Sequence, residues 1–215
     1  MFRKVYPVEI EISGRAAMFT RPDTGGGFVT YPGPTYSACL AIFGSVARLE
    51  TAYIKPTRVH ICRPIVYHRY YTNYNGPLRK DKSVTEGNPY QYPLTLLVNV
   101  CYQIFGEAEN VPEEALRSQK YQQYLNDHNN RHHLQDLFNR RIKQGRYYST
   151  PFLGQKEFVP DYFGPLRPEN HPLEEINETI PSMLFTVFDR PAWGQYAPVF
   201  HQNVKIVKGV LDYAQ

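Results

Sequence analysis

The stretch Leu94–Phe105, LTLLVNVCYQIF, is apolar enough to form a strand at the centre of a sheet. A strand that is buried on both faces is a nearly continuous apolar run, whereas a strand with one buried face alternates apolar and polar residues. Residues 8–12, VEIEI, show this alternation near the start of the chain. We therefore expect a sheet in which residues 94–105 lie inside and residues 8–12 form a strand with one buried face.

Three helices are predicted, one before this central strand in the chain and two after it. Thr35 is a favourable N-cap, and residues 36–49 after it carry apolar side chains at helical spacing. Pro112 suits a first helical position and opens a second helix, which Asn129–Asn130 closes. The third helix lies in the stretch 128–141, HNNRHHLQDLFNRR, whose leucines and phenylalanine follow helical spacing and predict an apolar stripe.

The order of the segments predicts the fold class. The remaining segments are extended structure over 59–71, turn residues throughout 72–93, and strands over 183–190 and 204–213. The succession of strand, helix, strand, insertion, strand and two helices is typical of an α+β fold with a ferredoxin-like (RRM-like) core. We expect this core in residues 1–160, with a β-hairpin inserted around residues 67–93. A small, mostly β C-terminal extension is expected in residues 161–215.

The composition narrows the class of protein. The 215 residues carry a net charge of +4 and include 18 tyrosines, which permits an anionic partner such as nucleic acid. Cys39, Cys62 and Cys101 are far apart, so neither a zinc ribbon nor a disulfide framework is expected. The N-terminal residues lack the apolar segment of a signal peptide, and no apolar run reaches membrane-spanning length. We expect a cytoplasmic protein with no membrane partner.

The segment 67–82, YHRYYTNYNGPLRKDK, interleaves tyrosines with basic residues. Aromatic rings stack on the bases of a single strand of nucleic acid, while arginine and lysine hold its phosphates. A solvated hairpin with tyrosines along its stem explains the same residues, and the sequence leaves both interpretations open. Under the first interpretation the expected RNA contacts are Arg69, Tyr70, Tyr71, Arg79 and Lys80.

The histidines of the stretch 128–141 raise the question of a metal site. Such a site would use His128, His132 and Asp136 on one helical face, but Asn129–Asn130 predicts that the helix breaks between the first two. The neighbouring His132 and His133 point about 100° apart on a helix and do not chelate together. We therefore expect no metal and no other cofactor.

Two further interpretations of the same stretch stay open. A metal-independent ribonuclease uses the 2′-hydroxyl of its RNA as the nucleophile, so the protein supplies a general acid or base and a cation for the phosphate. A histidine beside arginines at a helix start meets both needs. A basic surface helix with capping histidines also explains the residues, and the residues by themselves favour it over the ribonuclease interpretation.

The sequence resembles the CRISPR-associated Cas5 family, most closely its subtype I-C branch. The resemblance rests on short motifs in a fixed order over most of residues 5–160. They are Gly14, Ala17 and FTRPD (19–23), YPGPTYSA (31–38), RPI (63–65), NVCYQI (99–104) and HHLQDLFNRRIKQGRYYSTPFLGQKEF (132–158).

This resemblance implies a fold, partners and a role. The fold is a RAMP-type ferredoxin-like domain with a hairpin thumb. The role is to grip the 5′ handle of the crRNA at one end of a Cascade complex. The implied partners are crRNA or its precursor, the Cascade backbone subunits and the large subunit, and, indirectly, target DNA. The RNA-binding residues expected in addition to those of the 67–82 segment are Arg21, Tyr36, Arg131, Arg140 and Lys143.

The resemblance also implies cleavage of precursor crRNA, because proteins of the I-C branch cut repeat RNA with a tyrosine, a lysine and a histidine and without a metal. The histidine falls on His133 or, second, on His132. The lysine position then holds His132, preceded by Arg131, and the tyrosine position holds Ala47, with Tyr53 nearby. A structural subunit without catalytic activity is the alternative, in which another enzyme processes the RNA.

Overall fold

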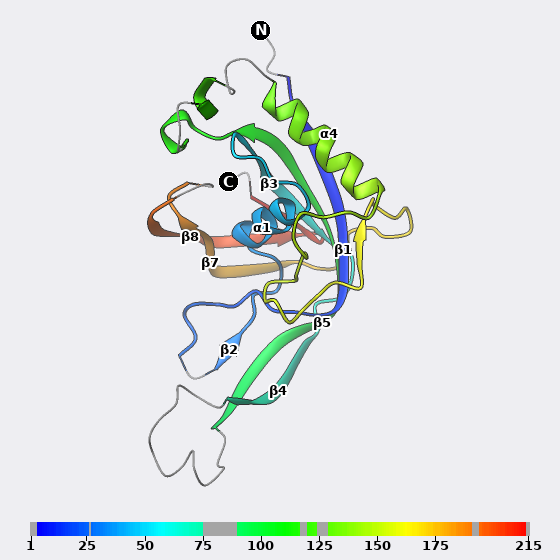
Figure 1. The fold of residues 1–215 in the computed structure, drawn as a ribbon. Coiled ribbons are helices and arrows are strands. Elements are labelled where there is room, and N and C mark those ends of the chain that lie inside the picture. Colours follow the sequence, from blue (N-terminus) through cyan, green and yellow to red (C-terminus); the bar gives the residue numbers. More distant parts are fainter. Residues whose placement is uncertain are drawn as a thin grey trace.

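The computed structural model describes residues 4–25, 27–74, 90–116, 120–123, 129–190 and 194–213. Its elements in chain order are β1 (Pro7–Ala17), β2 (Phe28–Val29), α1 (Tyr36–Val46), β3 (Ala52–Ile61), β4 (Tyr67–Tyr74), β5 (Tyr90–Asn110), the 3-10 helix η1 (Glu113–Ala115), α4 (Asn130–Lys143), β6 (Tyr162–Gly164), β7 (Glu178–Phe188), β8 (Tyr196–Val207) and β9 (Val210–Asp212) (Figure 1). The protein is thus α+β, as predicted. No described helix is long and apolar enough to cross a membrane.

The described strands form one mostly antiparallel sheet in the order β6-β1-β5-β3-β9-β8-β7. The second part of β5 lies between β1 and β3, which confirms the central strand predicted over 94–105. The first part of β5 pairs with β4, from Tyr67 opposite Leu97 to Tyr74 opposite Tyr90, and β2 pairs with it in parallel. This pairing confirms the expected hairpin over its described residues, and residues 75–89 lie outside them. In Figure 1 the β4–β5 hairpin extends away from the rest of the molecule.

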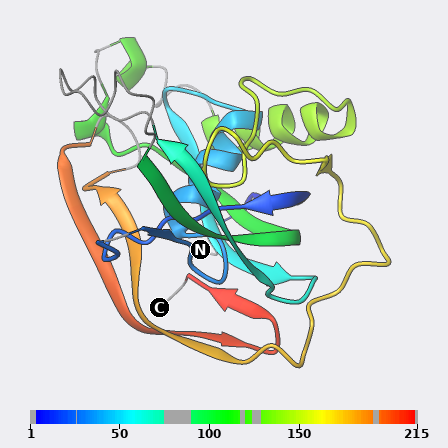
Figure 2. The ribbon, with the colours of Figure 1, turned by 90° about the horizontal axis from the view of Figure 1, so that it is seen from below.

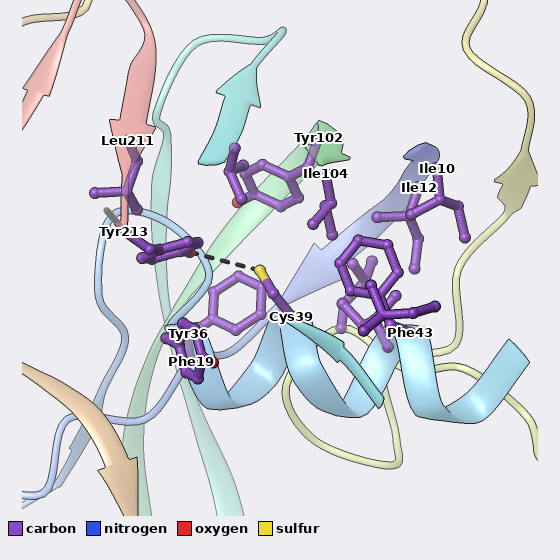
Figure 3. Close-up of a cluster of buried hydrophobic side chains, with 14 of the residues drawn as sticks. Ile10, Ile12, Phe19, Tyr36, Cys39, Phe43, Tyr102, Ile104, Leu211 and Tyr213 are labelled. Carbon is purple, nitrogen blue, oxygen red and sulfur yellow. Dashed lines mark hydrogen bonds between the residues drawn. The ribbon is translucent and has the colours of Figure 1, made fainter. Parts of the chain in front are cut away.

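Helices α1 and α4 cover one face of this sheet. Helix α4 contacts β1, β3 and β5, whereas α1 contacts β3 and β7. The two helices meet through Phe43 and Phe138, whose ring centroids are 5.6 Å apart. Figure 3 shows Cys39 and Phe43 of α1 facing isoleucines from β1 and β5. The predicted apolar stripe of α4 is confirmed, because Leu134, Phe138 and Ile142 are buried.

The ends of α1 follow from its sequence. Thr35 caps the first turn, as predicted, since its hydroxyl accepts the N–H of Ala38 at 3.1 Å. The helix ends at Val46, three residues earlier than expected, because Ala47 is extended. At its first turn, Cys39 contacts the hydroxyl of Tyr213, which also donates to the carbonyl of Pro34 (Figure 3). The C-terminal strands are therefore fixed to the core at the start of α1.

Strand β1 is buried more fully than its alternating sequence predicts. Glu11, expected on an exposed face, is completely buried. It accepts hydrogen bonds from the side chains of Gln103 and Asn170 and from both the backbone and the guanidinium of Arg167. Residues 167–170 therefore cover this side of β1. Burial alone raises the pKa of Glu11, but the hydrogen bonds outweigh burial and hold the pKa below its ordinary value.

Three other expectations about secondary structure are wrong. The helix expected from Pro112 is a short 3-10 turn that stops at Leu116, whose backbone is extended, and helical structure resumes in residues 120–123. The extended segment 59–71 is interrupted after β3 and resumes as β4. The strand expected over 204–213 is a hairpin of β8 and β9, because Lys208 and Gly209 both have positive φ and turn the chain. In Figure 2, β7 and β8 run along the outer edge of the molecule.

Two of the motifs that carry the family resemblance pack against each other. The carbonyl of Leu153 accepts the N–H of Met18 at 2.9 Å, which joins the FLG segment to the chain just before FTRPD. Gly154 has a φ of +93°, and a Cβ built on it would lie 2.0 Å from the Met18 carbonyl oxygen. Only glycine fits this approach of the two backbones.

Two other motifs meet where the hairpin leaves the core sheet. Asn99 of NVCYQI has a φ of 58° inside β5, between the residues that pair with β4 and those that pair with β3. Arg63 of RPI donates a hydrogen bond to the Asn99 side chain. A left-handed residue within a strand bends it, and asparagine tolerates this conformation better than most residues. These motifs therefore set the direction of the hairpin.

Candidate RNA-binding and cleavage site

Helix α4 starts at Asn130 because Asn129 caps it. The side-chain oxygen of Asn129 accepts the N–H of His132 at 3.2 Å, and its backbone carbonyl accepts the N–H of His133 at 3.0 Å. Asn130 is buried and accepts the hydroxyl of Thr51 at 2.9 Å, which fixes the helix start to the segment after α1. The helix boundary predicted at Asn129–Asn130 is confirmed.

His132 lies on the flank of α4 that faces the start of β1. Its ring meets the Tyr6 ring edge-on, with centroids 5.8 Å apart, and its Nδ1 lies 3.4 Å from Oδ2 of Asp136. Asn129 donates to the Tyr6 hydroxyl, and the Arg131 guanidinium lies 5.2 Å from the centre of the Tyr6 ring. The His132 side chain is 52% exposed, so these neighbours orient its imidazole while it stays accessible to solvent.

Sequence reasoning missed two residues of this group. Tyr6 is buried beside His132, and the ammonium of Lys4 lies 5.4 Å from the centre of the Tyr6 ring. Both precede β1, far from α4 in the chain, so no spacing in the sequence links them to the histidine. The structure thereby brings Tyr6 to His132 and places the cations of Lys4 and Arg131 near the Tyr6 ring.

His133 is exposed, and its side chain points about 100° away from that of His132 around the helix. It follows Asn130 by three residues, so the two side chains are neighbours on the helix surface. Further along the helix, Arg141 donates to the carbonyl of Val46 at 2.8 Å, which joins α4 to the end of α1. Ala47, at the position where the resemblance implies a tyrosine, is buried and has no polar group. The two histidines thus face different surroundings.

The hairpin presents a second basic and aromatic surface. Tyr67, Arg69 and Tyr71 alternate along β4 and therefore share one face. Tyr71 is 60% exposed, and the guanidinium of Arg69 lies 5.6 Å from the centre of its ring. Arg21, held by a two-pronged hydrogen bond to Asp23, is also close to Tyr67, whose pKa is raised mainly by burial.

Other expected RNA-binding residues are less favourably placed. Tyr36 is buried and stacked on Phe185 with ring centroids 4.2 Å apart, and burial raises its pKa, so it belongs to the core. Tyr70 packs beside Leu94 and Leu96 rather than on the open face. Arg140 and Lys143 are exposed in the last turn of α4, about 10–15 Å along the axis from His133. Arg79 and Lys80 lie outside the described residues.

The geometry bears on the metal question as well. His132 and Asp136 do share a face and contact each other, as the helical spacing required. His128, the third ligand that a metal site on this helix would use, lies outside the described residues. Within the described part of the chain, no group of three or more histidine, cysteine or acidic side chains is arranged to hold a metal ion.

The two candidate surfaces lie at opposite ends of the molecule. Figure 1 shows α4 starting at one end and the β4–β5 hairpin projecting from the other. Strand β5 connects them, since it begins in the hairpin and ends at Asn110, beside the segment that holds the start of α4. The arrangement suits an elongated ligand that contacts the hairpin and α4 together.

Comparison with known proteins identifies relatives with this architecture. No protein-family model matches the chain. The chain is 27% identical, over 95% of its length and 90% of the relative, to a protein of Thermus thermophilus named CRISPR pre-crRNA endoribonuclease Cas5d. Among solved structures, a CRISPR-associated protein superposes with a TM-score of 0.69 at 17% identity, covering 99% of this chain and 95% of that one. A functionally uncharacterized protein of Streptococcus mutans gives a TM-score of 0.64 at 16% identity, covering 97% of this chain and 92% of the other.

These likenesses span nearly the whole chain and agree with the order of its motifs. The solved structures share its fold, and the Thermus relative is similar to it over nearly its whole length. The comparisons therefore agree with the resemblance of this chain to the CRISPR-associated Cas5 family and its I-C-like branch.

Proposed function

We propose that this protein binds the 5′ handle of crRNA as a subunit of a type I Cascade complex in the cytoplasm, and that it also cleaves precursor crRNA without a metal. The observation that carries the proposal is full-length similarity to a pre-crRNA endoribonuclease, combined with basic and aromatic surfaces at both ends of β5. Its protein partners would be the Cascade backbone subunits and the large subunit, and target DNA would be reached through the guide.

A ferredoxin-like core is part of this proposal. The four strands in the order β6-β1-β5-β3, with α1 between β1 and β3 and α4 between β5 and β6, have the βαββαβ connectivity of that fold. We assign residues 1–160 to this core and its hairpin, and residues 161–215 to an extension that also supplies β6 as the edge strand. The hairpin then takes the role of a thumb.

The thumb would hold RNA through stacking and charge. Tyr71 is exposed enough to stack on a base, and Arg69 beside it keeps a cation next to the neighbouring phosphate. Tyr67 and Arg21 extend this surface toward the core. A single strand of RNA suits such a surface, because stacking on tyrosine is tolerant of base identity.

Cleavage would use the histidines at the start of α4. One imidazole accepts the proton of the 2′-hydroxyl as that oxygen attacks the phosphorus, and an acid protonates the departing 5′-oxygen. The products are a 2′,3′-cyclic phosphate and a 5′-hydroxyl. We place His133 as the acid–base group, with His132 and Arg131, which lie beside Tyr6 on a different side of the helix, supporting the negative charge of the RNA phosphates. Tyr6 and Asp136 would orient His132.

Incubation of the purified full chain with repeat RNA in excess chelator tests the catalytic part. We expect cleavage that His133→Ala reduces by about 10²- to 10⁴-fold. His171, an exposed histidine remote in sequence from α4, provides the matched control, and His171→Ala should cut at the wild-type rate. Tight RNA binding with no product would establish the non-catalytic alternative. Undiminished cleavage by His133→Ala would move the assignment to His132.

A further inference from the structure

A cavity lies beside the segment whose Thr51 holds Asn130 at the start of α4, and it has no role in the scheme above. Its volume is about 400 Å³, and it is lined by Arg48, Leu49, Glu50, Thr51, Lys120, Tyr121 and Tyr148. Three separate segments meet there: the chain directly after α1, residues 120–121, and the segment that follows α4. None of these residues was singled out as a ligand contact by the sequence.

The walls of the cavity are fixed by hydrogen bonds. The N–H groups of Tyr148 and Ser149 both donate to the carbonyl of Ser45, which anchors that segment to α1. Thr51 accepts the N–H of Val111 on its carbonyl and donates its hydroxyl to Asn130. The cavity is therefore attached to the start of α4.

The lining has the chemistry of a nucleotide site. Tyr121 and Tyr148 are 36% and 62% exposed, so their rings are available to stack on a base. Arg48 and Lys120 supply positive charge for a phosphate, and the single carboxylate, Glu50, is able to accept a hydrogen bond from a base or ribose. The volume falls within the range of small-ligand pockets and suits one nucleotide.

The other large cavity makes a useful contrast. It has a volume of about 290 Å³, lies beside α1 near Phe152 and Gly154, and is lined by uncharged residues. Hydroxyl groups such as those of Thr20 and Ser37 line it, but it offers neither a cation nor an exposed tyrosine ring. Charge and aromatic rings therefore favour the cavity beside residues 48–51 as the site for RNA.

We propose that the cavity beside residues 48–51 binds one nucleotide of the RNA, next to the phosphate that faces His133. Tyr148 and Tyr121 stack on its base, and Arg48 and Lys120 neutralise its phosphate. His133 and Asn130 are neighbours on the helix, and Asn130 contacts the cavity wall through Thr51, so a nucleotide held there would be close to the helix turn that carries the histidine. This inference rests on the proposed RNA-binding function. It also brings the hydroxyls of Tyr121 and Tyr148 to the RNA, whereas Ala47, at the position where the resemblance implies a tyrosine, has no hydroxyl.

Binding of a fluorescent 12-nucleotide oligo-uridine RNA to the full chain tests the cavity. Losing one stacked ring should weaken binding by about 5- to 100-fold in Tyr148→Ala. Tyr147→Ala is the matched control, since Tyr147 is 48% exposed but leans on Phe163 outside the cavity, and it should stay within about twofold of wild type. Ultraviolet crosslinking of the same RNA, followed by peptide mapping, should mark Tyr121 or Tyr148.

The outcomes separate this inference from the proposed catalysis. Weaker binding by Tyr148→Ala together with a crosslink in the cavity supports the site even if repeat RNA is not cleaved. Rescue of binding by Tyr148→Phe, with cleavage still reduced, would show that the hydroxyl also takes part in the reaction. Wild-type affinity in the folded Tyr148→Ala and Lys120→Ala variants, with crosslinks only in the hairpin, would overturn the inference. The inference would also be overturned if these variants bind RNA as the wild type does but no longer assemble into Cascade, because the cavity would then bind a protein.

Discussion

Replacing Arg167 with leucine should destabilise the fold by about 3 kcal/mol. Removing one partner of a buried ion pair leaves the other charge uncompensated, which commonly costs about 3–5 kcal/mol. Glu11 would keep four donors, from Gln103, from Asn170, from the Cys101 thiol and from the backbone N–H at position 167, so the lower end of that range applies. The variant also loses the contact between the guanidinium and the Tyr162 ring, 4.1 Å from its centre, which is worth about 0.5–1 kcal/mol.

Urea unfolding at neutral pH measures this loss, and the chain offers a matched control. Arg15 and Asp161 form a comparable pair between β1 and the segment before β6, but their side chains are 93% and 57% exposed and the atoms are 3.8 Å apart. Arg15→Leu should therefore cost less than about 1 kcal/mol. Equal losses in the two variants, or a loss under 1 kcal/mol in Arg167→Leu, would refute the reasoning from burial.

The pH dependence provides a second measurement on the same pair. The pKa of Glu11 is lowered in the folded protein, so the carboxylate contributes stability at pH values above its unfolded pKa, near 4.5. This contribution is lost as the pH falls through the lower, folded pKa. The difference in unfolding free energy between wild type and Arg167→Leu should be complete at pH 7 and shrink below about pH 4.5. A difference that stays constant down to pH 3 would contradict the assignment.

Three further pairs of variants test the fold and the thumb. Gly154→Ala should cost more than about 3 kcal/mol in urea unfolding, because its Cβ would overlap the Met18 carbonyl. Gly145→Ala, at a φ of 63° in open space, should cost about 1 kcal/mol. Asn99→Val should destabilise by about 1–3 kcal/mol and Asn99→Gly by less, since only the former strains a positive φ. For single-stranded RNA, Arg69→Ala should reduce the slope of log affinity against log salt concentration by about 0.7. Tyr71→Ala should instead weaken binding at every salt concentration. An unchanged slope in Arg69→Ala would show that Arg69 does not contact the RNA.

Local patterns were sufficient to predict most of the fold. The apolar run over 94–105, the N-cap at Thr35 and the helix start at Asn129 depend on residues a few positions apart, and the structure has all three. Turns that need positive φ were harder, because Lys208 precedes its glycine in a segment that otherwise continues the strand pattern. Asn99 escaped notice for the same reason, since nothing adjacent to it signals a bend.

The candidate site depended on contacts that a single sequence does not contain. The basic helix and its histidines were visible as a pattern, but Tyr6 meets His132 only because β1 and α4 pack together. Glu11 looked solvent-exposed for a similar reason, since the residues that cover it come from a segment near position 167. Tyr36 was predicted to contact RNA because the resemblance matches residues to a family motif but does not show which of them are buried.

The length of β5 has a geometric consequence. This strand of 21 residues runs without interruption from the hairpin to Asn110, and the next residue, Val111, donates to Thr51, which holds Asn130 at the start of α4. At about 3.3 Å per residue its contour is close to 70 Å. The residue count of β5 therefore sets the length of strand between the surface proposed to bind RNA and the one proposed to cleave it. Adding two residues to β5 on the hairpin side of Asn99, and two to the start of β4 opposite them, would preserve which side chains face each way while moving the hairpin surface by about 7 Å.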